Sequence, residues 1–251
     1  MSAPASSRPP PPLFHVPAPP PALHLSEEPL DPTGAALLAA LDAPDLAPLR
    51  AASRRIELAA GAVAFRQGEP RGAIFVIDRG EMRIFHAGPS GREVTLAYWG
   101  PGNFIGGPDL FEGGPHMWSG VATRPSRLWV VPGAALRAAA AASPPLALAL
   151  IDALAHKGRC MSALIHLFGT RSARERLARL LVQIAERDGR PEGDGLSLRR
   201  DFSQEDLARL VGVTRQWVSA TFERWRRDGL IALTPTRLVI HDLDALRAVA
   251  G

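Results

Sequence analysis

The sequence predicts an α+β chain, with a β-rich region first, a long helix after it and a small helical domain at the end. Three observations carry this prediction. Short apolar runs separated by glycine-containing turns fill residues 55–132, small or apolar residues recur at steps of four and three over residues 147–168, and residues 202–231 have the pattern of two helices joined by a tight turn. A chain of 251 residues can bury two separate cores.

The composition is that of a globular protein, with 46% hydrophobic and 22% charged residues. No apolar run approaches the ~18 residues of a membrane span, and the N-terminus lacks the features of a secretory signal. We therefore expect no membrane partner and a cytoplasmic location. With Cys160 as its single cysteine, the chain has no intramolecular disulfide and no iron–sulfur cluster, which typically needs about four thiolates.

The charge balance does not decide between function classes. A net charge of +4 is weak support for a nucleic-acid partner, and Lys157 is the only lysine beside many arginines. Arginine forks suit phosphate and guanine, but a GC-rich genome would give the same bias.

Residues 1–32 form a proline-rich segment that holds eleven of the 24 prolines. Such a segment cannot build a core, so we expect a disordered arm; a docking arm for a partner is the alternative. Two short helices are predicted after it, from Thr33 to Leu41 and from Asp45 to Ala52.

The region over residues 55–132 is predicted to form a barrel or sandwich. Six runs have strand character: Ile56–Leu58, Val63–Phe65, Ile74–Ile77, Met82–Phe85, Val94–Trp99 and Leu128–Val131. Strands about 8–12 residues apart with glycine turns between them are typical of such folds.

A long helix is predicted over residues 143–169, with one regular stripe of small or apolar residues. The stripe consists of Ala147, Ile151, Leu154, Gly158, Met161, Ile165 and Phe168. This spacing is typical of a coiled-coil seam and favours a helix-to-helix homodimer, although the stripe would also suit packing on the barrel. Gly158 weakens the helix by roughly 1 kcal/mol but allows close helix approach.

A second helix is predicted from Ser172 to Glu186, because Ser172 and Glu175 fit a capping box. A loop is predicted to follow from Asp188 to Gly195.

The most informative motif lies over residues 202–219. Ser203 is predicted to cap a first helix, and Gly212 supplies the positive φ that the turn requires. The buried face of this helix is predicted to be Leu207, Leu210 and Val211.

A second helix of this motif is predicted over Thr214–Arg227, with Thr214 as its cap. Val218 and Phe222 are its expected buried positions, and the side chains expected to point away from the core are Arg215, Gln216 and Ser219. In a helix-turn-helix this N-terminal turn enters the DNA major groove. Ile231–Leu233 and Leu238–Ile240 follow as a predicted two-stranded wing, and Asp242 begins a last short helix.

The chain resembles the CRP/FNR (catabolite activator / fumarate–nitrate reduction regulator) family of transcription regulators from about Leu46 to Val249. The markers are Phe65-x-Gln-Gly-Glu, Gly80-x-x-x-Ile84, Pro101-Gly-Asn-Phe, Gly106, Arg174-x-Arg176-Leu-Ala and the helix-turn-helix. The resemblance implies an N-terminal double-stranded β-helix (jelly-roll) sensor domain of the cyclic-nucleotide-binding type, a dimerisation helix and a C-terminal winged helix-turn-helix. The implied domains are residues 1–32 (arm), 33–142 (sensor), 143–169 (dimerisation helix) and 170–251 (DNA-binding domain).

The resemblance also implies partners and contacts. We expect a homodimer on double-stranded DNA with a pseudo-palindromic operator, RNA polymerase as a further partner, and a dimer seam of Ile151, Leu154, Gly158, Met161, Ile165 and Phe168. The expected DNA-binding residues are Ser203, Gln204, Thr214, Arg215, Gln216 and Ser219. Ser203, Gln204 and Thr214 are assigned to phosphates, while Arg215 can fork onto guanine and Gln216 can pair with adenine.

The recognition helix departs from the family at two reading positions. The family often has a glutamate two residues into this helix and an arginine four residues later, and this chain has Gln216 and Ala220 there. We therefore predict a half-site other than TGTGA or TTGAT. Trp217 can pack on the sugar-phosphate backbone or on the domain core, and the core is favoured.

The sensor also departs from the family. Cyclic-nucleotide-binding members use a Gly-Glu-Leu turn and, ten residues on, an Arg-Ser-Ala segment; this chain has Gly106-Gly107-Pro108 and Met117-Trp118-Ser119 at those places. The missing arginine would cost several kcal/mol of phosphate binding, so tight cyclic AMP binding is not expected. The candidate effector pocket comprises Gly106, Gly107, Met117, Trp118, Met161 and Ser162. It either binds an unknown small-molecule effector or is filled by Trp118.

No cofactor, metal site or catalytic site is predicted. Haem on His116 or His86 is an unfavoured alternative, and Cys160 is expected to be an apolar filler rather than a redox sensor. A sensor module that regulates an enzyme is a further alternative, but no kinase loop or P-loop accompanies the barrel. An enzyme is not expected, because no nucleophile–base or metal-ligand pattern is present.

Overall fold

The computed structural model describes residues 43–251 apart from residues 90, 112, 194, 200 and 201. The described chain divides into two compact units, the first built from residues 43–84 and 97–158 and the second from residues 85–96 and 159–251. The proline-rich arm and the helix predicted from Thr33 to Leu41 lie outside the described residues.

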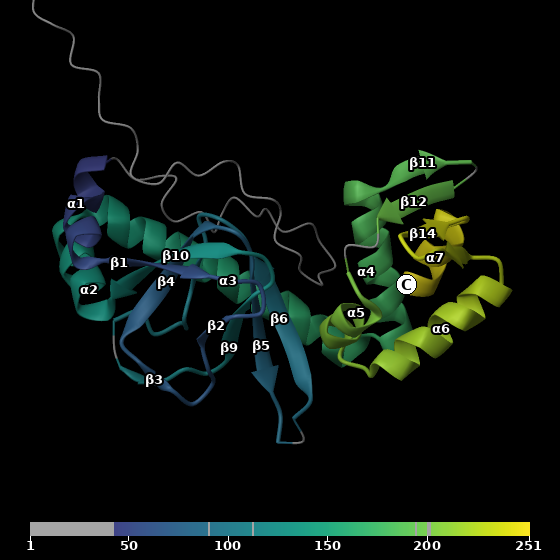
Figure 1. Ribbon diagram of the computed structural model, residues 1–251, viewed down its shortest axis with the longest axis horizontal. Helices are drawn as coiled ribbons and strands as arrows, with labels where there is room; N and C mark the ends of the chain where they lie inside the picture. The colour runs from purple at the N-terminus through teal and green to yellow at the C-terminus, as the bar shows by residue number, and fades with distance from the viewer. Residues whose placement is uncertain (1–42, 90, 112, 194, 200–201) are drawn as a thin grey trace, which may run out of the picture. The chain divides into compact units, whose positions relative to one another are not determined.

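The chain forms the predicted double-stranded β-helix (Figure 1), and its strands make up the first unit except for the hairpin of residues 85–96, which belongs to the second. One sheet has the order β1 (Arg54–Leu58), β10 (Ser126–Pro132), β4 (Ala73–Arg79) and β7 (Phe104–Ile105). The other has the order β2 (Val63–Phe65), β9 (Ser119–Ala122), β5 (Met82–Ala87) and β6 (Glu93–Trp99), and β3 (Pro70–Arg71) pairs with β8 (Gly114–Pro115).

The predicted strand runs all fall inside observed strands, and burial explains their patterns. The run Ile74–Ile77 is continuously apolar because β4 lies between two neighbouring strands and is buried on both faces, whereas β1, at the edge of its sheet, is mostly exposed. Four strands were not predicted, namely β3, β7, β8 and β9. Three of them have only two residues, which is too short to show a period.

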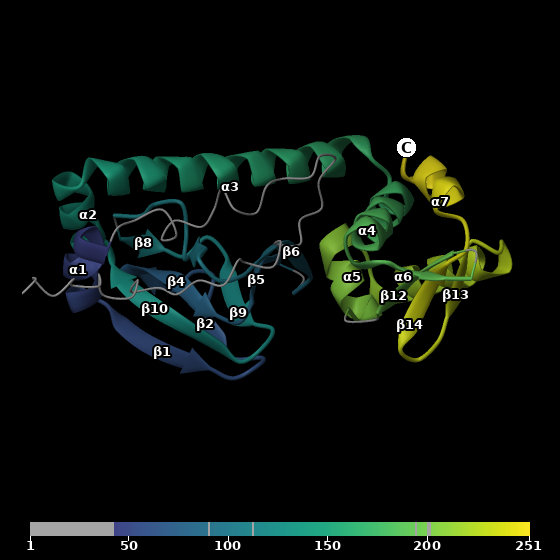
Figure 2. The same cartoon turned by 90° about the horizontal axis from the view of Figure 1, so that it is seen from above.

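Three helices cover the first unit and share its core. They are α1 (Ala43–Ala52), α2 (Gly133–Ala142), for which we predicted no element, and the start of α3 (Pro144–Thr170). Their buried residues Leu49, Leu136, Ala139, Leu146, Leu150 and Ala153 join one apolar cluster with Ile74, Val76, Phe104, Leu110 and Val131. α3 runs without a break (Figure 2), close to the helix predicted over residues 143–169.

The second unit combines a helix-turn-helix with a small sheet. Its elements are α4 (Ala173–Asp188), β11 (Arg190–Glu192), β12 (Gly195–Arg199), α5 (Gln204–Val211), α6 (Arg215–Arg227), β13 (Ile231–Leu233), β14 (Arg237–Ile240) and α7 (Leu243–Ala250). The capping box predicted before α4 is confirmed: Glu175 N donates to Ser172 Oγ (3.3 Å), and Ser172 N donates to Glu175 Oε2 (2.6 Å).

One prediction about this unit was wrong, because the loop predicted from Asp188 to Gly195 contains β11. The predicted wing is confirmed by the antiparallel pairing of β13 with β14, and it is part of a larger four-stranded sheet with the order β11-β12-β14-β13. All three residues of β11 are exposed. A strand with no buried face has no alternating apolar pattern, so nothing in its residue types distinguishes it from a loop.

Candidate nucleic-acid interface

The first helix of the motif, α5, has the predicted cap and turn. Ser203 Oγ accepts from Asp206 N (3.1 Å) and Asp206 Oδ2 accepts from Ser203 N (3.0 Å), so a carboxylate completes the capping box. The predicted apolar face is confirmed, because Leu207, Leu210 and Val211 are buried. Gly212 ends the helix with φ 75°, a left-handed conformation that favours glycine.

The second helix, α6, begins at the predicted cap. Thr214 Oγ1 accepts from Trp217 N (3.2 Å). Val218 and Phe222 are buried as predicted, and Trp225, which we did not single out, is fully buried beside Phe222 with ring centroids 6.1 Å apart. These three side chains fix the inner face of α6, so the opposite face is presented outward.

The first turn of α6 carries the two predicted reading residues on its surface. Arg215 and Gln216 are exposed, as is Ala220 one turn later, while Trp217 and Ser219 are half-buried. The N-terminus of a helix carries partial positive charge and free N–H groups, which suit phosphate. An exposed guanidinium and an exposed amide at this place can reach both phosphates and base edges.

The last turn of α6 adds basic residues that the sequence analysis missed as candidates. Arg224 and Arg227 are exposed, and Arg226 pairs with Glu223 (2.9 Å). Cations here also stabilise the helix C-terminus, so their residue type alone did not distinguish a DNA contact from a helix-end charge.

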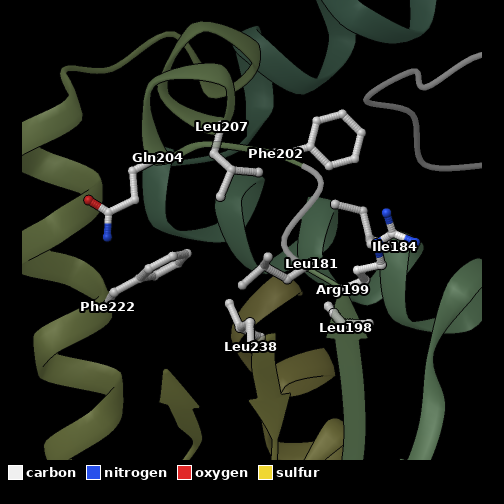
Figure 3. A pocket seen from close by; sticks show the side chains of 9 residues that line it. All are labelled: Leu181, Ile184, Leu198, Arg199, Phe202, Gln204, Leu207, Phe222 and Leu238. Carbon is white, nitrogen blue, oxygen red and sulfur yellow. The ribbon is translucent and has the colours of Figure 1, made fainter. Parts of the chain in front are cut away.

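Ser203 and Gln204, the other predicted DNA-binding residues, lie at the N-terminus of α5. The Ser203 hydroxyl is exposed but already serves as the cap. Gln204 is half-buried and lines an apolar hollow (Figure 3). The other side chains of this hollow are Leu181, Ile184, Leu198, Arg199, Phe202, Leu207, Phe222 and Leu238.

The wing is closed by its own turn. Thr234 N donates to Arg237 O (2.9 Å), and Arg237 N donates to Thr234 Oγ1 (3.0 Å). The exposed Arg237 guanidinium bonds Glu192 on β11 at 2.7 Å. The ion pair therefore ties Arg237 of the wing to β11, a strand that was not predicted from the sequence.

A buried arginine joins the end of α3 to the turn of the helix-turn-helix. Arg176 donates from Nε to Val211 O (3.1 Å) and from Nη1 to Arg171 O (2.6 Å), and its Cζ lies 4.3 Å from the ring centroid of Phe168. Burial, followed by repulsion from Arg92, lowers the pKa of Arg176.

In the β-barrel, a buried cation lies beside the Gly106-Gly107 turn, although the position aligned with the family's phosphate-binding arginine holds Met117. Gly106 and Gly107 have φ 125° and 139°, and a Cβ on Gly107 would meet Arg71 Nη1 at 2.8 Å. Arg71 Nη2 donates to Asp109 Oδ2 (3.1 Å) and to Gly113 O (3.3 Å). Sequence alignment could not find Arg71, because it comes from β3, far from the aligned segment.

The remaining candidate residues of the barrel differ in exposure. Met117 is 53% exposed and Trp118 is half-buried. His116 is buried, its ring stacks on Phe65 at 4.3 Å, and its Nδ1 lies 2.8 Å from Gly106 O. Burial is the main cause that lowers the pKa of His116. Met161 and Ser162 belong to the second unit, so their place in an effector pocket stays a prediction.

One face of α3 is exposed along its length. Leu148, Ile151 and Ile165 are 62%, 60% and 73% exposed. Exposed residues recur at steps of three and four along this face: Leu148, Ile151, Ala155, Gly158, Ser162, Ile165 and Gly169. Of the stripe predicted as a seam, Leu154, Met161 and Phe168 are half-buried instead. Leu154 packs on the barrel core and Phe168 on Arg176.

The described part of the chain lacks two kinds of feature. None of its helices combines the length and the apolar character that crossing a bilayer requires. Its His, Cys, Asp and Glu side chains form no group of three or more that could hold a metal ion.

Two family models match this chain. A Crp-like helix-turn-helix domain matches residues 175–249, and a cyclic nucleotide-binding domain matches residues 55–143. Together the two matches cover more than half of the chain.

Known bacterial proteins match most of its length. The CRP-like cAMP-activated global transcriptional regulator of Mycobacterium tuberculosis is 29% identical over 192 residues, which are 76% of this chain and 85% of that protein. A CRP-family transcriptional regulator from Thermus thermophilus has a structure with TM-score 0.62 and 25% identity, over 78% of this chain and 96% of that one.

A third protein is similar to this chain in its fold. The c-di-GMP-responsive global regulator CLP of Xanthomonas campestris has TM-score 0.71 at 22% identity, over 80% of this chain and 100% of that one. A β-roll of the cyclic-nucleotide-binding type, a long helix and a capped helix-turn-helix thus occur in one chain in the same order as in these regulators. The chain belongs to the CRP/FNR family of DNA-binding transcription regulators.

Proposed function

We propose that this regulator acts as a homodimer that reads a pseudo-palindromic operator with the N-terminal turn of α6. The observation that carries the proposal is the capped start of α6, where Arg215 and Gln216 are exposed while Val218 and Phe222 anchor the opposite face. In a helix-turn-helix dimer, two such helices reach half-sites about one helical turn apart.

Selection of bound DNA fragments, followed by affinity measurement, tests this proposal. We expect a half-site other than TGTGA or TTGAT, because Gln216 and Ala220 stand at the reading positions. Arg215→Ala should cost about 1–3 kcal/mol of operator affinity and relax one base position. The control is Arg174→Ala, which removes an exposed arginine from α4. Equal weakening by Arg215→Ala on all sequences would make Arg215 a phosphate contact.

We propose that the exposed face of α3 forms the dimer seam. Leu148, Ile151 and Ile165 would be its apolar members, and Gly158 with its exposed small neighbours would allow close helix approach. Relative to the seam predicted from sequence, Ala155, Ser162 and Gly169 would replace Leu154, Met161 and Phe168.

Sedimentation analysis of Ile165→Asp tests the seam. The variant should be a monomer at micromolar concentration and lose operator affinity, because a carboxylate would be buried without a partner. Ala138→Asp, on the exposed face of α2, should stay a dimer. A dimeric Ile165→Asp protein would show that the seam lies elsewhere.

We propose that the barrel binds an effector other than cyclic AMP, or none. Met117 and Trp118 stand at the family's phosphate-binding positions, and the Arg71 guanidinium is already bonded to Asp109 and Gly113 O. A phosphate would have to compete with a carboxylate for this cation. Sub-micromolar affinity for cyclic AMP by isothermal titration would overturn the proposal, and a Soret band in the purified protein would overturn the expectation of no haem. RNA polymerase is proposed as a partner on the family resemblance alone.

A further inference from the structure

We infer that Arg176 is a positioning residue that locks the helix-turn-helix to the end of α3 and so sets the spacing between the two recognition helices of the dimer. The inference rests on the proposed function, since it requires a dimer formed along α3. All the contacts that carry it lie within the second unit.

The acceptors of Arg176 lie at the C-terminal ends of two helices. Val211 is the last residue of α5, and Arg171 directly follows the last residue of α3. Carbonyl groups at helix ends lack intrahelical donors and carry the negative end of the helix dipole. One guanidinium therefore satisfies a carbonyl beside each helix, and its rigid planar fork fixes the angle between the two acceptors.

A second contact joins the same two places. The ring of Phe168, in the last turn of α3, lies under the Arg176 guanidinium at 4.3 Å and against Gly212, where a Cβ would approach the ring to 2.6 Å. Gly212 therefore serves two needs, the positive φ of the turn and the room for Phe168. Arg176, Phe168 and the Val211–Gly212 turn form one packed unit, which we term the α3–turn lock.

The lock has a geometric consequence in a dimer. α3 would provide the dimer seam, with Ile165 exposed one turn before Phe168. Only Val213 separates the turn held by the lock from Thr214, the cap of α6. The distance of each recognition helix from the dimer axis would therefore depend on the lock. A one-base-pair change in operator spacing displaces a half-site by about 3.4 Å and roughly a tenth of a turn.

This role differs from a purely stabilising one in what it predicts. A lost stabilising contact lowers the stability of the fold and weakens binding to every operator by the same factor. A loosened lock instead lets the helix-turn-helix move against α3, so operators with a wrong spacing are bound relatively better. Tolerance of spacing is therefore the decisive readout.

Fluorescence anisotropy with the selected operator and with spacers changed by one and two base pairs measures this tolerance. The full-length wild type should lose roughly tenfold or more in affinity per base pair, and Arg176→Gln less than about threefold, since each tenfold corresponds to about 1.4 kcal/mol. Arg176→Lys should be intermediate, because an ammonium retains the charge without the fork. Phe168→Leu should broaden the profile as Arg176→Gln does. Arg174→Gln, which removes an exposed charge two residues away, should keep the wild-type profile.

The outcomes separate the two proposals. If the wild type binds no operator, or all spacings equally, the dimeric reading of DNA is wrong. If the wild type discriminates between spacings and the folded Arg176→Gln variant has the same spacing profile, the role inferred for the lock is wrong while the proposed function stands. If Arg176→Gln fails to fold, Phe168→Leu decides, and an unchanged profile for that variant overturns the lock.

Discussion

The helix-turn-helix and the β-barrel differ in how far apart their interacting groups are in sequence. In the helix-turn-helix, the caps act over three residues: Ser203 on Asp206, and Thr214 on Trp217. In the barrel, Arg71 bonds Asp109, which lies 38 residues further along the chain. The first kind of contact is encoded by neighbouring residue types, whereas the second exists only after the strands have paired.

This difference limits which functional residues can be inferred from a family's sequence pattern. In the helix-turn-helix the scaffold and the exposed reading positions follow directly from the motif. In the barrel the position aligned with the family's cation holds Met117, which is 53% exposed, while the buried cation is supplied by Arg71 on β3. The chemistry of the barrel must therefore be taken from its three-dimensional contacts.

The largest expected effect concerns Gly212, where a local turn conformation and a long-range contact with Phe168 coincide. Gly212→Ala should lower the free energy of unfolding by about 2–5 kcal/mol, from left-handed strain of roughly 1–2 kcal/mol and displacement of Phe168 at roughly 1–3 kcal/mol. Gly229→Ala is the matched control, since Gly229 has φ 73° with open space around its Cβ position. Urea denaturation of both variants measures the difference. Equal losses of unfolding free energy in the two variants would mean that Phe168 moves aside at no energetic cost.

The same contrast decides how much of the molecule could be predicted. Strands with at least one buried face, such as β4, and capped helices were predicted because adjacent residues carry the apolar run or the cap. The fully exposed β11 and the two-residue strands leave no such signal. On α3 the small residues gave a repeat, but only the packed structure distinguishes Leu154, which covers the barrel, from the exposed Ala155.

A pair of barrel variants tests whether the Arg71–Asp109 contact contributes to stability mainly by compensating the charge of the buried guanidinium. The Arg71 side chain is 3% exposed and that of Asp109 is 60% exposed. Asp109→Asn leaves a cation buried with less compensation and should cost about 1–3 kcal/mol of stability. Arg71→Met removes the cation and frees an already hydrated carboxylate, so it should cost less. Denaturant unfolding ranks the two, and a greater loss for Arg71→Met would contradict this view of the barrel.

Loss of the Thr214 cap at the start of α6 is expected to lower stability by a smaller amount and to act only at that helix end. Thr214→Ala removes the acceptor for Trp217 N and should cost about 1 kcal/mol of stability. Thr214→Ser keeps the hydroxyl and should retain most of that stability. If Thr214 also contacts a phosphate, as the sequence predicts, the alanine variant should bind all DNA sequences more weakly by one factor. Unchanged DNA affinity at full folding would restrict Thr214 to capping.

The smallest expected effect is the pH dependence that His116 gives the barrel. The Gly106 carbonyl can only accept, so Nδ1 carries a proton; burial, reinforced by Arg71, holds the pKa of His116 below the ordinary value of 6.5 and favours the neutral ring. The unfolded chain therefore binds a proton that the folded barrel does not, and stability falls as the pH drops below about 6.5. His116→Asn offers a comparable N–H donor without this titration. Thermal unfolding at pH 7.5 and pH 5.5 should show a larger acid loss for the wild type than for His116→Asn. Equal losses would place the acid sensitivity in other groups and leave His116 with a packing role alone.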